Sequence, residues 1–254
     1  MILKRPEFRY WRVTALLAVV VALSACARPE LAGEIYDPNE AQNRQMHEIN
    51  KRLDRAVVRP VALSYGKSTP EELRIAVGNF ASNLSLPSTV LNDILQLQLG
   101  DAIHNTARFV LNTTVGLGGL LDPASEAGLG PRDTDFGETL YVWGFGEGAY
   151  VELPLLGPST TRDAVGKIVD MAINPLNRYV PAPQKYFLPV ASVMSRLGDR
   201  YRFGTTVDSI LYESADSYAQ SRLLYLESRR FQLGVEVKAQ DDIYEGLYDE
   251  ILSE

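Results

Sequence analysis

The chain has 254 residues, 46% of them hydrophobic, and its 25 Lys and Arg against 32 Asp and Glu give a net charge of −7. This acidic balance argues against nucleic acid as a partner, because phosphate backbones are bound by clustered Lys and Arg. The single cysteine excludes an intrachain disulfide, so packing and polar contacts must hold the fold together.

Residues 1–25 have the organisation of a secretory signal peptide. Four basic residues lie among the first 12, and residues 13–25 carry no charge and end in small side chains before Cys26. This run is short for a membrane-spanning helix, which needs roughly 20 apolar residues. Removal of residues 1–25 takes away the four basic residues and Glu7, which leaves a net charge of about −10.

Cys26 follows Leu23, Ser24 and Ala25, the pattern in which the thiol is acylated after cleavage and becomes the new N-terminus. We therefore predict lipid attachment at Cys26; a stray thiol near the cleavage site is the alternative. Several acyl chains on one residue anchor a protein far more firmly than one chain does. No aspartate follows Cys26 to retain the lipoprotein at the inner membrane, so if the cell has two membranes, as a Gram-negative cell does, we expect it on the periplasmic side of the outer membrane.

The mature chain is predicted to comprise a tether (26–37), a helical domain (38–234) and an acidic tail (235–254). A mostly apolar stripe at three- and four-residue spacing predicts a first helix from residue 38, which Pro60 bends or ends. A capping box at Thr69 and Glu72 predicts the start of the next helix. The stripe of the first helix consists of Gln42, Met46, Ile49, Leu53 and Val57.

Two consecutive helices are predicted to be apolar on nearly every side. Pro87 begins the first of them, and Asp101 caps the second, which Gly116 ends. Because almost no loop joins them, we expect an antiparallel or sharply bent pair. Helices of this kind belong in a large core or in contact with lipid. Neither is long enough to cross a bilayer, so we expect side chains that reach part way into a membrane.

Residues 143–160 read WGFGEGAYVELPLLGPST and carry no Lys, Arg or His. Their glycines permit tight turns, and Ser159 or Thr160 is predicted to cap the helix that follows. A short hairpin at 140–153 is the only sheet predicted, so the expected fold class is all-α. A long helical tract from Val190 is predicted to break at Gly198, Gly204 and Ser214.

Signatures of catalysis are lacking in the sequence. His47 and His104 have no second His or Cys at metal-ligand spacing, so we expect surface or interfacial roles and no metal site. No G-x-S-x-G nucleophile elbow is present. Asp133 and Asp135 are paired carboxylates, for which solvated loop positions are the simplest interpretation. The sequence therefore predicts neither an enzyme nor a cofactor.

Several long motifs resemble the MlaA family, also called VacJ, of outer-membrane lipoproteins that maintain lipid asymmetry. Gln42 and Ser217 depart from the family pattern, at positions where an aromatic residue and a proline are expected. The matching runs are DPNEAQNR (37–44), LDRAVVRPVA (53–62), VGNFASNLSLPSTVLNDILQ (77–96), ARFVLNTTVGLGGLLDPAS (107–125) and DFGETLYVWGFGEGAYVELPLLGPSTTRDAVG (135–166).

The resemblance implies a ring of short amphipathic helices around a central channel, embedded in one leaflet of the outer membrane. Mislocalised phospholipids of the outer leaflet would descend through this channel to a periplasmic carrier similar to MlaC. The resemblance also implies association with a trimeric porin. Because a passive channel makes and breaks no bond, this function agrees with the absence of catalytic motifs.

Two sets of residues are candidates for contact with lipid. Polar residues that we predict to line the path are Arg162, Asp163, Asn79, Asn83 and Asn92. The alternative for Arg162 and Asp163 is a helix cap with a structural ion pair. Residues predicted to contact the membrane are Leu91, Leu95, Phe109, Leu117, Trp143 and Phe145.

Two other classes of function remain as alternatives. A periplasmic lipid hydrolase would need a nucleophile, which the sequence does not identify. A structural lipoprotein that supports the cell envelope would need an exposed basic or aromatic surface for the cell wall.

Overall fold

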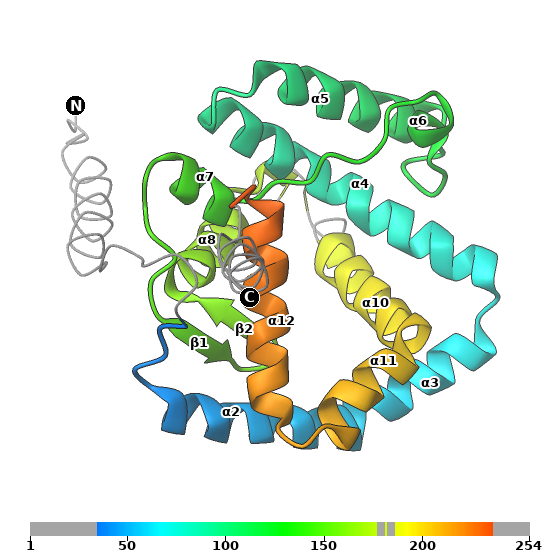
Figure 1. The fold of residues 1–254 in the computed structure, drawn as a ribbon. Coiled ribbons are helices and arrows are strands. Elements are labelled where there is room, and N and C mark those ends of the chain that lie inside the picture. The colour runs from blue at the N-terminus through cyan, green and yellow to red at the C-terminus, as the bar shows by residue number, and fades with distance from the viewer. Residues whose placement is uncertain (1–34, 177–180, 182–185, 236–254) are drawn as a thin grey trace, which may run out of the picture.

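The computed structural model describes residues 35–176, 181 and 186–235, which form a set of helices with one short β-hairpin (Figure 1). The predicted signal peptide, the lipidation site Cys26, most of the tether and most of the acidic tail lie outside the described residues. The prediction of a mainly helical fold is confirmed. The hairpin is also present, but it lies at residues 150–160 rather than 140–153.

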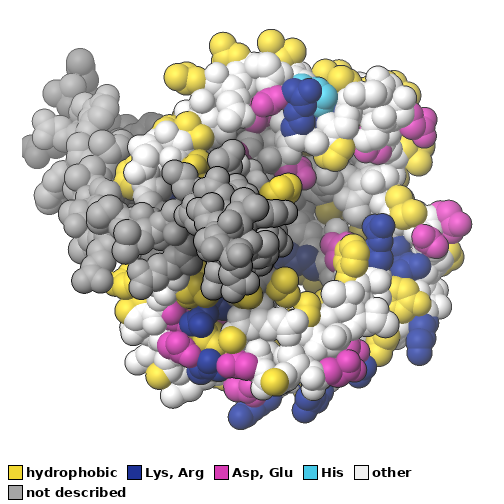
Figure 2. Space-filling model, viewed as in Figure 1, with side chains coloured by type: hydrophobic (Ala, Val, Ile, Leu, Met, Phe, Trp, Pro, Cys, Tyr) yellow, Lys and Arg dark blue, Asp and Glu magenta, His cyan; other side chains and the backbone are white. Residues whose placement is uncertain are grey.

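The elements follow one another around a central opening (Figure 1), and the space-filling view shows a hollow in the middle of the same face (Figure 2). In chain order they are α2 (Glu40–Leu53), the π-helix η1 (Asp54–Val58), α3 (Arg59–Ser68), α4 (Glu71–Leu95), α5 (Leu99–Thr114), α6 (Pro123–Glu126), α7 (Phe136–Val142), β1 (Tyr150–Leu153), β2 (Gly157–Thr160), α8 (Thr161–Ile173), α10 (Phe187–Arg202), α11 (Gly204–Asp208), the π-helix η3 (Ser209–Glu213) and α12 (Ser217–Gln232).

The described elements pack mainly within two groups. In the first, which we call the hairpin lobe, α2, α8 and α12 pack on the hairpin and α7 packs on α8. In the second, the helical lobe, α10 packs on α3 and α4, and α4 packs on α5. The π-helix η1 joins α2 to α3, and η3 joins α11 to α12, so both π-helices lie where the chain passes between the lobes. The two lobes also meet where α4 contacts α7.

A small aromatic core holds the hairpin lobe together. Tyr150 and Tyr218 stack edge to face at 5.8 Å and, with Leu226, are almost fully buried. Asn43 ties α2 to the strand, because its side-chain amide donates to the Tyr150 carbonyl (3.0 Å) and accepts from the Glu152 amide (3.0 Å). The side-chain amide of Asn43 thereby replaces a neighbouring strand at the edge of β1.

Several predicted helix boundaries are wrong. Pro87 does not begin a helix but lies inside α4, whose packing on α5 and α10 keeps the helix continuous past the missing amide. Thr69 provides no cap, since α4 begins at Glu71 and its first amides have no side-chain partner. Gly198 lies inside α10, and Asp101 lies in the first turn of α5 rather than at its cap.

Other boundary predictions are confirmed. The predicted antiparallel pair is α4 and α5, which lie side by side (Figure 1). Thr160 caps α8, because its hydroxyl accepts from the amide of Asp163 (3.2 Å). The prediction that Pro60 ends the first helical tract is wrong, since Pro60 lies in the first turn of α3 and the tract runs on from η1 without a break.

α7 and α8 approach so closely that their backbones touch. A Cβ added at Gly166 of α8 would lie 2.4 Å from the amide nitrogen of Gly137 in α7. The contact therefore requires glycine at this position, because backbone atoms cannot move aside as a flexible side chain can.

We expect Gly166→Ala to lower the free energy of unfolding by about 3 kcal/mol through overpacking of the α7–α8 contact. Gly100→Ala in the first turn of α5 is the matched control, since nothing lies within 4 Å of its added Cβ. The control should be neutral or stabilise by about 0.5 kcal/mol. Equilibrium unfolding by denaturant in mild detergent measures both. Equal stabilities of the two variants would contradict the backbone contact.

Candidate functional site

α5 is inverted in the sense that its strongly polar side chains are buried and its apolar side chains are exposed. Its exposed side carries large apolar side chains, as at Ile103, which is 72% exposed, together with three threonines. Its buried face carries Asn105, Arg108 and Asn112. A helix in a water-soluble protein normally turns its apolar stripe inward. The orientation of α5 therefore fits an apolar environment outside the molecule.

The inward polar residues of α5 are paired. Arg108 contacts the carbonyl of Leu129, donates to Ser125 (3.1 Å) and forms an ion pair with Asp122 (3.2 Å). Asn112 donates to the same carboxylate (2.8 Å). These contacts fasten the α6 segment to α5 and satisfy most of the inward polar groups, although Arg108 Nε and Asn105 Oδ1 are buried without a partner.

Exposed apolar side chains also lie on the turns beside α5, at the end of α7 and, apart from these, at the tip of the hairpin. Figure 2 shows hydrophobic side chains along the outer edge over α5. Large exposed apolar areas mark a contact with protein or membrane. The exposed apolar side chains of these segments are Ile94, Leu97, Leu99, Ile103, Val110, Val115, Leu117, Leu120, Leu121, Val142, Trp143, Leu155 and Leu156. No helix in the described part of the chain has the length and apolar character needed to cross a membrane.

Three exposed leucines occupy a strained backbone conformation. Leu97, Leu117 and Leu155 have φ angles of 61°, 55° and 65°, and they are 83%, 68% and 75% exposed. A left-handed conformation costs a residue with a Cβ roughly 1 kcal/mol. Leu97 lies between α4 and α5, Leu117 lies after α5, and Leu155 lies at the hairpin tip. Each of these turns therefore holds an exposed apolar side chain on a strained backbone.

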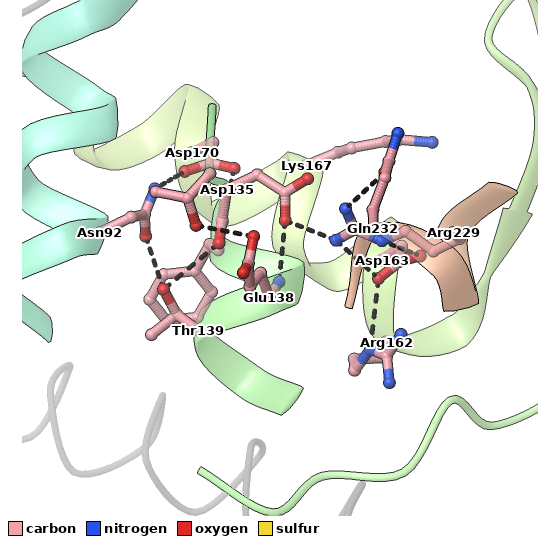
Figure 3. A network of polar contacts seen from close by, with 12 residues as sticks. Asn92, Asp135, Glu138, Thr139, Arg162, Asp163, Lys167, Asp170, Arg229 and Gln232 are labelled. Atoms are coloured by element: carbon pink, nitrogen blue, oxygen red, sulfur yellow. Dashed lines mark hydrogen bonds and ion pairs between the residues drawn. The ribbon is translucent and has the colours of Figure 1, made fainter. Parts of the chain in front are cut away.

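A polar seam joins α4 to α7 and α8 (Figure 3). Asn92 donates to Asp170 (2.8 Å) and accepts from Thr139 (3.0 Å). One turn later, Gln96 donates to Thr139 (2.9 Å) and to Thr134 (2.7 Å). Burial raises the pKa of the Asp170 carboxyl, although the amides of Phe136 and Asn92 partly offset this effect. The contact between α4 and the α7–α8 pair is thus made by uncharged donors and one half-buried carboxylate.

A second network joins α7, α8 and α12 (Figure 3). Arg229 donates to Asp163 (3.1 Å) and to Asp135 (2.7 Å), and Arg162 donates to Asp163 (3.2 Å). Tyr225 donates its hydroxyl to Asp163 at 2.5 Å. Burial alone would raise the pKa of Asp163, but Arg229 and Arg162 outweigh it and hold this pKa below its usual value. Asp163 is therefore ionised and fully partnered.

The structure places the predicted lining residues in three regions. Arg162 and Asp163 are only 5% and 4% exposed, within the α7–α8–α12 network. Asn92 belongs to the seam, while Asn79 and Asn83 lie against the turn after α5, where Asn83 donates to the Gly118 carbonyl (3.3 Å) and Asn79 to the Leu120 carbonyl (3.3 Å). The Nη2 atom of Arg162 is buried without a partner. Lining of a lipid path by these residues stays a prediction.

Among the predicted membrane contacts, Leu117 and Trp143 are exposed, and Leu91, Leu95, Phe109 and Phe145 are partly buried. The sequence interpretation missed other exposed side chains, including Leu97, Ile103 and Leu155. The signal for Ile103 was the polar stripe Asn105, Arg108 and Asn112, which identifies the opposite face of α5 as the buried one.

His47 lies in a buried chain of polar contacts. Its ring nitrogens lie 3.1 Å from the Ser217 hydroxyl and 3.4 Å from a Glu152 carboxylate oxygen. These residue types also form catalytic triads. Here Lys51 donates to the same hydroxyl (3.2 Å) and Tyr150 donates to the same carboxylate (2.6 Å). Ser217 is buried, so the arrangement ties α2 to β1 and α12 and gives a substrate little access.

Metal binding finds no support in the geometry. Within the described ranges, no group of three or more His, Cys, Asp or Glu side chains is arranged to hold a metal ion. His104 lies 2.8 Å from the Gly130 carbonyl, which is a structural contact.

A model of the MlaA lipoprotein family matches residues 35–232, which include every element described above. The chain belongs to the MlaA lipoprotein family. The match covers the inverted α5, the polar seam and the α7–α8–α12 network, so these features lie within the family region.

Individual relatives agree with this assignment. The intermembrane phospholipid transport system lipoprotein MlaA of Escherichia coli K12 is 33% identical over 241 residues, which cover 91% of this chain and 92% of that protein. An uncharacterized protein of Rickettsia bellii is 35% identical over 197 residues, covering 77% and 76%. A solved structure described as the structural basis for maintenance of bacterial outer membrane lipid asymmetry superposes with a TM-score of 0.65 at 30% identity, covering 78% of this chain and 98% of that one.

Arg229→Gln should lower the free energy of unfolding by about 3 kcal/mol at pH 7, because it leaves Asp163 buried with incomplete charge compensation. The pKa of Asp163 is depressed in the folded protein, so its stabilising effect is present above the unfolded value of about 3.9 and is lost as the pH falls below it. The difference between variant and parent should therefore shrink toward pH 3. Denaturant unfolding at both pH values measures it, and a pH-independent difference would argue against Asp163 as its source.

Replacement of Leu97, Leu117 and Leu155 together by Asn should weaken binding to phospholipid vesicles at least tenfold, because each exposed leucine contributes about 1.5 kcal/mol or more when buried in lipid. Asn tolerates the left-handed backbone better than leucine, so stability in detergent should hold or rise. Vesicle co-sedimentation measures the binding. The triple replacement by Met keeps the apolar bulk and should bind as the parent does; similar binding by the Asn variant would show that these leucines do not contact lipid.

Proposed function

We propose that this chain is a lipoprotein of the outer membrane that removes mislocalised phospholipids from the outer leaflet and passes them to a periplasmic carrier. Membership of the MlaA lipoprotein family and the similarity to the phospholipid transport lipoprotein of Escherichia coli support this function. The observation that carries it is the inverted α5, with apolar side chains outside and Asn105, Arg108 and Asn112 inside. A molecule built in this way is suited to hydrocarbon at its outer surface and to a polar headgroup in its interior.

The mechanism requires no covalent chemistry. A phospholipid that changes leaflets must move its charged headgroup through a region where unpaired charge is costly. A polar path through the ring of helices lowers this barrier while the acyl chains remain in apolar surroundings. Arg162 is the best-placed member of the proposed lining for a phosphate group, since its Nη2 is a buried donor without a partner. Asp163, Asn79, Asn83 and Asn92 complete the proposed lining.

Acylation of Cys26 would hold the ring at the periplasmic face of the membrane. The exposed apolar surface over α5 and the neighbouring turns would then sink into the inner leaflet. A trimeric porin and a soluble carrier similar to MlaC are the partners we propose, the first beside the ring and the second below it. A transport function without catalysis is supported by the similarity to the phospholipid transport lipoprotein of Escherichia coli and by the buried position of Ser217.

A structural lipoprotein that supports the envelope is the alternative function. It would leave the lipid composition of the outer leaflet unchanged when removed. No observation on the described residues favours it, because the exposed surface over α5 is apolar rather than basic.

Deletion of the gene should raise the phospholipid content of the outer leaflet severalfold and increase detergent sensitivity. An amine-reactive reagent that does not cross the membrane measures outer-leaflet phosphatidylethanolamine. Expression of the parent chain should restore the low level, and Cys26→Ala should restore it only weakly, because the apolar surface alone must then hold the protein at the membrane. If deletion leaves the labelling unchanged, the transport function is wrong.

A further inference from the structure

The hinge-like parts of the ring lie at one corner. The π-helices η1 and η3 both connect elements of different lobes, and each adds one residue to a helical turn. Asp54 at the start of η1 accepts from Arg200 of α10 (2.8 Å) and from Tyr212 of η3 (2.6 Å). Asp208 bridges Arg200 (2.6 Å) and Arg59 (2.6 Å). Alternating charges therefore hold this corner together while its two helical connections have irregular turns.

The polar seam lies across the opening from this corner. Figure 1 places the junction of α4 with α7 and α8 on one side of the ring, and the meeting of α2, α3, α11 and α12 on the other. A small rotation of the hairpin lobe about the π-helical corner would separate the seam most. The hydrogen bonds of Asn92 and Gln96 across the seam include no complete ion pair, unlike the charged contacts of the corner, so a polar molecule is able to replace them.

The outer rim of the seam is apolar. Ile94, Leu97, Val142 and Trp143 are exposed beside it, and the indole of Trp143 donates across it to the Leu95 carbonyl (3.1 Å). Behind this rim the side chains are polar and buried. A lipid that approaches through hydrocarbon would thus meet an apolar edge first and hydrogen-bonding groups immediately behind it.

We propose that the seam between α4 and the α7–α8 pair is a lateral gate, which opens about the π-helical corner and admits the headgroup of a phospholipid from the side of the ring. This inference rests on the proposed transport function and adds the route by which lipid enters. The seam consists of Asn92 and Gln96 on α4 and of Thr134, Thr139 and Asp170 opposite them.

The headgroup has the chemistry to replace the bonds that opening would break. Unpaired amides and hydroxyls in hydrocarbon cost several kcal/mol each, so the empty gate stays closed. Phosphate oxygens accept from the amides of Asn92 and Gln96, and an ammonium group donates to Asp170. The Oε1 atom of Gln96 is already buried without a partner, which leaves an acceptor ready for such a donor. The ligand class is therefore a phospholipid headgroup with both acceptors and N–H donors, such as phosphatidylethanolamine.

Crosslinking of the seam tests the gate in cells. Leu95→Cys with Trp143→Cys places thiols on its two sides, and Gly78→Cys with Ser195→Cys joins α4 to α10 within the helical lobe as the matched control. The acylated full-length chain supplies no other free thiol. A cleavable bis-thiol reagent should raise outer-leaflet phosphatidylethanolamine at least fivefold for the seam pair, reversed by reduction, with no change for the control pair. Equal labelling for both locked pairs would overturn the proposal.

A distance measurement supports the test independently of transport. Spin labels on the seam pair, with the protein in detergent and then in phosphatidylethanolamine vesicles, should show an added longer distance in the vesicles. Labels on the control pair should keep one distance. A single unchanged seam distance in both media would also overturn the gate. Failure of the parent chain itself to lower outer-leaflet phospholipid would contradict the transport function instead.

Discussion

The fold depends on one constraint: polar groups that are shielded from water must find partners within the protein. The described part of the chain buries few large apolar side chains, and the aromatic core of Tyr150, Tyr218 and Leu226 is small. Asn, Asp, Arg and Thr side chains occupy much of the interior instead. Burial of such a side chain costs free energy unless the side chain has a hydrogen-bond partner. The arrangement of helices is therefore set largely by the geometry of hydrogen bonds.

This constraint explains where the elements are fastened. Arg108 holds the α6 segment, Arg229 joins three helices, and Asp54 fixes the π-helical corner. Paired groups of this kind specify one arrangement more sharply than apolar packing does, since an Asn or Asp accepts few alternative neighbours. The seam differs from the other fastenings because its bonds are uncharged except for Asp170, and so it is the weakest of them.

Much of the architecture was predictable from the sequence because it follows from local signals. The apolar character of residues 87–121, the short connection between α4 and α5 and the capping position of Thr160 all depend on neighbours along the chain. The continuation of α4 through Pro87 was not predictable, since packing against α5 and α10 decides it. The two π-helices were likewise not predictable, because no residue type in their sequences distinguishes them from an α-helix.

The candidate site was less predictable than the fold. Motifs identified Arg162, Asp163 and Asn92 as polar groups near apolar helices, but their partners Arg229 and Asp170 come from distant positions. The sequence indicated a helix apolar on nearly every side that reaches part way into a membrane, but it did not show that Asn105, Arg108 and Asn112 form the buried face of α5. In a protein in contact with lipid, the polar stripe marks the inside.

The exposed leucines affect how the folded chain behaves in water before it reaches a membrane. A folded molecule with Leu97, Leu117 and Leu155 protruding from its turns is poorly suited to free diffusion through an aqueous compartment. Between export and insertion it would adhere to copies of itself. These side chains must therefore be covered until the molecule meets lipid, which then takes the place of whatever covers them.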